Sequence, residues 1–371
     1  MKQSDYINFL KGIAILGVIL VHSPLKIIGL DSSIKELVHF GAFGCQLFFL
    51  ISGYLIVSSW NRIIKESNRL SISLWHFYRR RFLSIAPIYY LFIILYQLIA
   101  YYISEFNLPP FYNICTEPLS IIANFLLLQG LDYNYFNNVV PGGWFIGTIV
   151  LFYIIFPILY KCHIKLCQLK NTLTPLFLTV IVSVISFIIQ FIVMNITGSW
   201  IQSRPGSFLY YSIVNQLPCL TLGMAIHDLN FDKINSKNLL LASFSIFIIT
   251  NLLYYGLRFQ YWVYSFIPLF LAFTFLFLFF GVKNIYKSKH IHNIKIINYL
   301  EKFRRLSFSA YFTNFIGAFI FPWALQLVLF HYNIVINPLV LYLILLIPIF
   351  FITFILVPPV DFLITRFKRL I

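Results

Sequence analysis

Ten apolar runs, each of roughly 20 residues, constrain this chain more than any other feature, because that length as an α-helix matches the hydrocarbon core of a bilayer. The runs cover residues 6–24, 39–60, 82–104, 144–162, 173–194, 208–227, 239–255, 261–281, 308–330 and 339–362. Lipid offers no hydrogen-bond partners to a backbone, so each run is expected to be helical. The sequence therefore predicts an all-α integral membrane protein, a bundle of about ten transmembrane helices. A shorter apolar stretch, residues 119–131, is expected to be re-entrant or interfacial.

Composition excludes a soluble globular chain. Of 371 residues, 60% are hydrophobic and 10% are charged, whereas soluble domains average about 25% charged residues. Ten spans and their connections leave little chain for an aqueous domain. We therefore expect one transmembrane domain over residues 1–371, with no soluble domain after the last span.

The distribution of basic residues predicts the orientation. The 27 Lys and Arg residues outnumber the 11 Asp and Glu residues, for a formal net charge of +16. Four of the basic residues fall in connections expected outside, namely Lys26, Lys35, Arg204 and Arg258. Nearly all the others fall in connections expected inside. Basic residues are enriched on the cytoplasmic side, so both termini are predicted to be cytoplasmic. The charge is then a layer that faces anionic lipid, and nucleic acid is not an expected partner because no binding module is present.

Acidic residues are missing from the middle of every span. This counts against proton-coupled transporters, which usually need buried carboxylates, and against a two-carboxylate glycosidase within the membrane.

Cys162, His163 and Cys167 stand close together, but Lys161 and Lys165 flank them and their spacing is a poor metal signature. We interpret the three residues as structural packing and expect no metal site.

The first apolar run contains two ionisable side chains, Lys11 and His22. Eleven residues make three helical turns with roughly 20° left over, so the two side chains share a face and lie about 16 Å apart along the axis. Asn8, Ile15 and Val18 are on the same face. Taken singly, Lys11 could snorkel to the inner headgroups and His22 could be an interfacial residue. Together they favour a functional passage, in which histidine could take a proton from an alcohol.

Five motifs resemble acyltransferase family three, the multi-spanning membrane enzymes that O-acylate surface polysaccharides and other exported molecules. The first is the basic residue followed eleven positions later by histidine. The others are the apolar run 43–56 with its Ser52-Gly53-Tyr54, the arginine-rich stretch 77–89, the Trp144-Phe145-Ile146-Gly147 start of a span that continues through Tyr153, and Leu222-Gly223-Met224.

Five positions depart from the family pattern. Asn8 and Gln46 stand where Asp is common, residues 149–150 are Ile and Val where acids often follow the Trp, and Asn314 replaces a frequent His. These departures leave His22 without an evident carboxylate, so its partner is expected to be neutral or absent.

The resemblance implies transfer from cytoplasmic acyl-CoA, most often acetyl-CoA, to a hydroxyl of a glycan or glycolipid that arrives from outside. His22 would be the general base, and no tightly bound cofactor is implied. The donor phosphates would meet Arg79, Arg81 and Arg305, with Lys11 deeper in the passage. Candidates for lining the passage or the acceptor site are Asn8, Gln46, Ser52, Trp144, Tyr153 and Asn314. The family also implies a multi-pass protein of a bacterial inner membrane.

Two alternatives stay open at this stage. One is a transporter or flippase for a polysaccharide precursor, which would need a more polar path than the sequence offers. The other is a relative of the same fold that has lost its chemistry.

Overall fold

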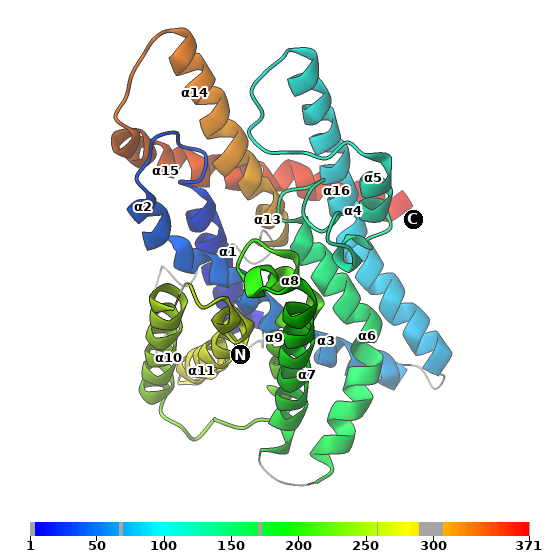
Figure 1. Ribbon diagram of the computed structural model, residues 1–371. Helices are drawn as coiled ribbons and strands as arrows, with labels where there is room; N and C mark the ends of the chain where they lie inside the picture. The colour runs from blue at the N-terminus through cyan, green and yellow to red at the C-terminus, as the bar shows by residue number, and fades with distance from the viewer. Residues whose placement is uncertain (1–3, 67–69, 170–172, 258, 289–306, 371) are drawn as a thin grey trace.

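The computed structural model describes residues 4–66, 70–169, 173–257, 259–288 and 307–370, and every regular element in these segments is a helix. Nine helical segments within them are long and apolar enough to cross a membrane. They are α1 (Ser4–His22), α3 (Gly44–Glu66), α4 (Leu70–Glu105), α6 (Gly143–Cys167), α7 (Thr174–Thr197), α10 (Ser236–Gly256), α11 (Ile267–Lys287), the α13–α14 segment, and α15 (Pro338–Ile355) (Figure 1). The prediction of a multi-pass helical membrane protein is confirmed.

Short helices form the connections. They are α2 (Ser32–Leu37), η1 (His39–Phe43), α5 (Pro118–Phe125), η2 (Gln129–Leu131), η3 (Trp200–Ser203), α8 (Phe208–Tyr211) and η4 (Tyr261–Ser265). After α15, the last helix is α16 (Val357–Leu370). The apolar stretch 119–131 lies in α5 and η2 and, as expected from its length, does not form a spanning helix.

The expectation of one continuous span over residues 208–227 is wrong. Ser212 has extended backbone angles and separates α8 from α9 (Ile213–Ala225), which has 13 residues. Almost all of α9 is buried, and it packs against α3 and α7 inside the bundle. A helix surrounded by protein does not have to match the bilayer thickness by itself. We count α9 as the tenth passage, which keeps the two ends of the chain on one side.

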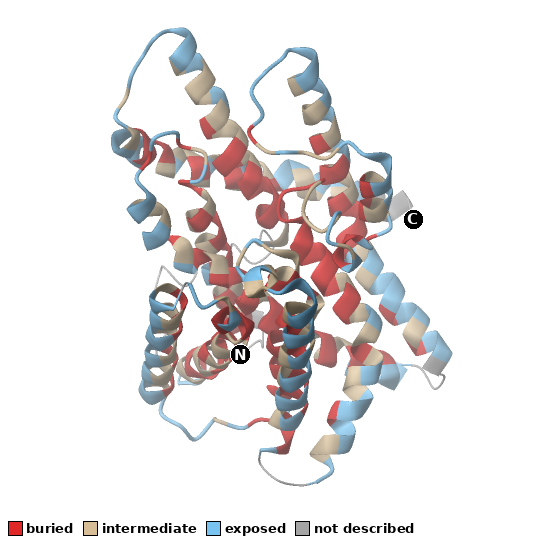
Figure 2. Cartoon of the chain, viewed as in Figure 1, coloured by how far each residue is buried: buried red, intermediate tan, exposed pale blue. Residues whose placement is uncertain are grey.

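The outer surface of the bundle is apolar where soluble proteins are polar. Large side chains such as Ile181, Ile185 and Phe191 on α7, and Phe244 on α10, are exposed, and Figure 2 shows α7 and α10 exposed along their outer faces. Such surfaces are stable against lipid tails. Buried polar side chains lie inside instead, including Gln46, Gln190 and Asn314.

A π-helical turn interrupts the segment that crosses near the centre of the bundle. α13 (Ser307–Phe315) continues through the π turn η5 (Ile316–Ile320) into α14 (Phe321–His331). Pro322 has no N–H to donate to the carbonyl four residues earlier, which explains local widening of the helix here. The turn follows Asn314 directly, so it shapes the wall beside that side chain.

Two glycines let α3 and α9 touch backbone to backbone. A Cβ on Gly53 would lie well inside the van der Waals distance of the Leu220 carbonyl oxygen, and a Cβ on Gly223 would do the same to the Leu50 carbonyl oxygen. Small residues at helix crossings are what allow such close packing in membranes. The Ser52-Gly53-Tyr54 and Leu222-Gly223-Met224 motifs therefore meet in one contact.

Gly53→Ala is expected to destabilise the protein by about 1–3 kcal/mol, because the new methyl group forces α3 and α9 apart. The measurement is the thermal unfolding midpoint of the detergent-solubilised chain. Gly256→Ala is the matched control, since a Cβ at Gly256 meets nothing within 4 Å. Equal unfolding midpoints for the two variants would contradict the close contact.

Candidate active site

A cavity of about 250 Å³ lies beside His22, at the end of the bundle that is expected to face outward. Its walls come from α1, η1, α3, α6, η5 and the connections between spans. The polar and aromatic residues of the wall are His22, His39, Phe43, Gln46, Tyr112, Asn137, Trp144, Tyr210, Tyr211, Tyr311, Phe315 and Phe319. This outer cavity is therefore mostly aromatic, with a few hydrogen-bonding groups.

The partner of His22 is Asn314. Nδ1 of His22 lies 2.9 Å from Oδ1 of Asn314, and Nδ2 of Asn314 donates to the carbonyl oxygen of Tyr311. The amide nitrogen can only donate, so this second bond orients the Asn314 side chain with its oxygen toward the ring. Oδ1 can only accept, so Nδ1 carries the proton and Nε2 of the neutral ring keeps a lone pair. The partner is neutral, as the sequence departures led us to expect.

Two further amides of the outer cavity have unused oxygens. Gln46 donates through Nε2 to Oε1 of Gln216 at 3.1 Å, which leaves its own Oε1 buried without a hydrogen-bond partner among the described residues. Oδ1 of Asn137 is likewise buried without a hydrogen-bond partner among the described residues. A buried acceptor without a donor costs free energy, so an O–H group that reaches these oxygens would be stabilised.

An inner cavity of about 280 Å³ lies toward the predicted cytoplasmic side. Lys11, Ser52, Arg81 and Tyr153 all line it. The guanidinium carbon of Arg81 lies 5.2 Å from the centroid of the Tyr153 ring, and Nε of Arg81 is buried without a hydrogen-bond partner in the described part of the chain. The inner cavity thus combines two cations, Lys11 and Arg81, which suits an anionic ligand.

Tyr311 separates the two cavities and lines both. Its ring lies 4.9 Å from that of Phe145, its hydroxyl donates to the carbonyl oxygen of Gly142 at 2.9 Å, and it is 2% exposed. Phe145 in turn stacks on Phe49 at 4.7 Å. These rings form an aromatic wall between Lys11 in the inner cavity and His22 in the outer cavity.

A family model described as an acyltransferase domain matches residues 4–357 of the chain. The chain belongs to acyltransferase family 3. It is accordingly a membrane acyltransferase, and the resemblance drawn from its five motifs is confirmed. No curated protein and no solved structure matches the chain.

The structure of this acyltransferase separates the predicted site residues into groups. Gln46 and Trp144 line the outer cavity with His22, Ser52 and Tyr153 line the inner cavity with Lys11 and Arg81, and Asn314 bonds His22. Asn8 is buried on α1 but lines neither cavity, and Arg79 is exposed. Arg305 lies outside the described residues.

Sequence reasoning missed several residues of the acyltransferase site. Tyr311 and Asn137 carry no local signal of their own, and only the fold brings them to the cavities. Lys26 lies near the outer cavity, with its ammonium 4.9 Å from the Phe319 ring and 5.9 Å from the Tyr112 ring, and burial lowers its pKa. The sequence did offer one signal for Lys26, because it is one of the few basic residues in connections predicted to lie outside.

We expect a charged, membrane-impermeant thiol reagent applied from outside to spare Ser52→Cys in the inner cavity, because Tyr311 blocks the path. In Ser52→Cys combined with Tyr311→Ala the new thiol becomes labelled from the same side. Peptide mass spectrometry distinguishes it from the native cysteines, and Cys45 in the outer cavity serves as the internal reference. Equal labelling of position 52 with and without Tyr311 would show that the aromatic wall is no barrier.

Proposed function

We propose that this acyltransferase moves an acyl group, most often acetyl, from cytoplasmic acyl-CoA to a hydroxyl of a cell-surface or exported glycan. His22 is the general base. The observation that carries the proposal is the paired bond of Asn314 to His22 and to the Tyr311 carbonyl, because it leaves Nε2 of the imidazole unprotonated in a cavity. A neutral imidazole with a free lone pair is what activation of an alcohol requires.

The outer cavity supports a sugar acceptor. Its aromatic walls suit the apolar faces of a sugar ring, and the unused oxygens of Gln46 and Asn137 suit its hydroxyl groups. One acceptor hydroxyl gives its proton to Nε2 of His22 while its oxygen forms a bond to the thioester carbonyl carbon. The C–S bond then breaks, and the thiolate of CoA recovers the proton from His22 as it leaves. The positive end of the α6 helix dipole, at Gly142 and Trp144 in the cavity wall, would stabilise the negative carbonyl oxygen between these steps.

The inner cavity supports an anionic donor that enters from the cytoplasm. Arg81 and Lys11 would bind the phosphate groups or hold the arm of acyl-CoA, and the narrow pantetheine chain would carry the thioester toward His22. Tyr311 and Phe145 close this path in the structure, so transfer requires their side chains to move. The same wall argues against the transporter alternative, which needs a continuous path for a whole saccharide.

His22→Gln is expected to lower acyl transfer by about 10²–10⁴-fold, the usual contribution of a general base. The measurement is mass spectrometry of surface polysaccharide from bacterial cells that express either form at matched levels. A mass increment of one acyl group should appear with the intact chain and be lost with His22→Gln. His331→Gln is the matched control, since His331 is exposed at the end of α14.

Asn314→Leu is expected to give a smaller loss, because the imidazole remains but its tautomer is no longer held. Equal increments in the intact chain and His22→Gln would remove His22 as the base and favour the transport reading. No increment on any glycan with the intact chain would overturn the glycan acceptor or indicate an inactive relative.

Arg81→Ala is expected to weaken acetyl-CoA binding by roughly 10-fold or more, since a charge-assisted hydrogen bond contributes about 1.5–3 kcal/mol. Lys11→Ala should also weaken binding, while Lys11→Arg should change it little. Titration calorimetry on the purified full chain measures these affinities. Arg80→Ala is the control, because Arg80 is exposed and pairs with Glu66 at 3.6 Å. An Arg81→Ala affinity equal to that of Arg80→Ala would exclude Arg81 from the donor site.

A further inference from the structure

A second cluster of reactive side chains lies outside both cavities, at the other end of α6. His163 and Cys167 are one turn apart on the last part of α6, and Asp228 follows α9. One ligand atom from each residue lies within 4.8 Å of the other two. His163 is 19 residues beyond Trp144, which places it about 29 Å along the helix from the outer cavity. The acyl-transfer chemistry therefore does not use this cluster.

The three side chains converge on one point. Nε2 of His163 lies 2.8 Å from Oδ2 of Asp228 and 3.6 Å from Sγ of Cys167. In a Cys–His–Asp nucleophilic triad the thiol and the carboxylate use different ring nitrogens. Here both meet Nε2, while Nδ1 of His163 is buried with no hydrogen-bond partner in the described chain. The arrangement does not fit a nucleophilic triad, but it fits three side chains that bind one common ion.

The distances fit a tetrahedral cation of zinc type. Zinc bonds of about 2.3 Å to sulfur and about 2.0–2.1 Å to nitrogen place those two atoms about 3.6 Å apart, the separation found between Cys167 and His163. Asp228 would withdraw by roughly half an ångström to admit the ion. Its side chain is 40% exposed, so it has room to do so. Imidazole, thiolate and carboxylate are also the ligand types that zinc prefers.

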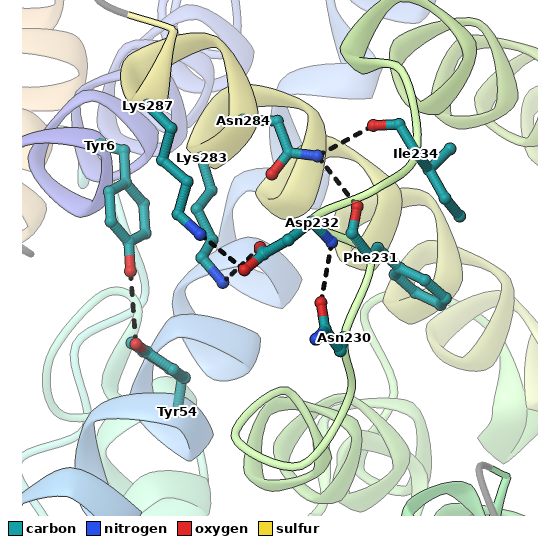
Figure 3. Close-up of polar contacts among 9 residues, drawn as sticks. All are labelled: Tyr6, Tyr54, Asn230, Phe231, Asp232, Ile234, Lys283, Asn284 and Lys287. Carbon is teal, nitrogen blue, oxygen red and sulfur yellow. Dashed lines mark hydrogen bonds and ion pairs between the residues drawn. The ribbon is translucent and has the colours of Figure 1, made fainter.

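The segment that carries Asp228 is held in place before any ion binds. Asp232 forms ion pairs with Lys283 at 3.1 Å and Lys287 at 2.6 Å, and Asn284 donates to the carbonyl oxygens of Phe231 and Ile234 (Figure 3). These contacts attach the connection between α9 and α10 to α11.

The residue beside Asp228 is also fixed. Nε2 of His227 lies 2.8 Å from the Tyr54 carbonyl oxygen and 3.1 Å from Oγ of Ser58, both on α3. These contacts direct the His227 side chain toward α3 and not toward the cluster. A preorganised ligand loop loses little conformational freedom on binding, which favours affinity.

We propose that His163, Cys167 and Asp228 bind one divalent cation of the zinc class at the predicted cytoplasmic end of α6. The fourth position is left to water, because Cys167 and Asp228 are both accessible. Thiolate and carboxylate together neutralise the ion, and the adjacent Lys161 and Lys165 are exposed. The ion would join α6 to the α9–α10 connection and stabilise the fold. This replaces the sequence-based interpretation of Cys162, His163 and Cys167 as packing, since Asp228 rather than Cys162 completes the set.

The test uses the purified full chain in detergent, stripped with a chelator and then supplied with ZnCl₂ alone. We expect one zinc per chain by elemental mass spectrometry after desalting, and a higher thermal unfolding midpoint that chelator reverses. Cys167→Ser and Asp228→Asn should weaken zinc binding by more than about 10–100-fold, because each removes a direct ligand. Both residues are accessible, so these variants should fold.

Cys162→Ser is the matched control, an exposed cysteine on the same helix that should leave zinc binding unchanged. Cobalt provides a second readout, since the thiolate-to-cobalt absorption band should disappear in Cys167→Ser. Zinc retained equally by Cys167→Ser, zinc lost from Cys162→Ser, or no zinc on the intact chain would each overturn the proposal. None of these readouts depends on acyl transfer.

Discussion

Polar side chains inside a lipid-embedded bundle must find their hydrogen-bond partners within the protein, and the rest of this structure depends on that constraint. His22 meets Asn314, and Gln46 meets Gln216. Deeper in the bundle Gln190 bridges Asn215 and Ser265 at 3.1 and 2.9 Å. These bonds join segments far apart in sequence, and they also orient each amide. The orientation of the Asn314 amide decides which nitrogen of a neutral His22 ring carries the proton, so the hydrogen bonds that join the helices also fix the tautomer of this side chain.

Under the proposed function, the two cavities would divide donor and acceptor binding between the two faces of the membrane. The inner one presents cations, and the outer one presents an imidazole among aromatic rings and amide oxygens. Tyr311 stands between them as a partition held by its hydroxyl bond to Gly142. In the proposed reaction this partition would keep water away from the thioester until the acceptor is bound, which is a common reason for enzymes to gate a reactive intermediate.

The predicted cytoplasmic end of the bundle has a different chemistry. There the connections are attached to the helices by ion pairs such as those of Asp232, and the His163 cluster adds a candidate cation site. These contacts have access to water, so charge can be used where the bilayer core forbids it. Charged groups are costly in the bilayer core and tolerated near water, so ionisable residues are few in the interior of the bundle and many at this end.

Much of the site could be predicted from the sequence, because membrane physics leaves short-range signals. Apolar run length predicted the spans. The eleven-residue spacing predicted one passage for Lys11 and His22, whereas the structure places Lys11 in the inner cavity and His22 in the outer one. The break at Ser212, the meeting of Gly53 with Gly223, and the wall formed by Tyr311 could not be predicted in this way. The sequence by itself determined a membrane-spanning helical bundle, since hydropathy acts within one helix, and its five motifs carried the resemblance to acyltransferase family three. Only the tertiary structure decided which residues face each other, because contacts between helices depend on packing between segments that no local pattern encodes.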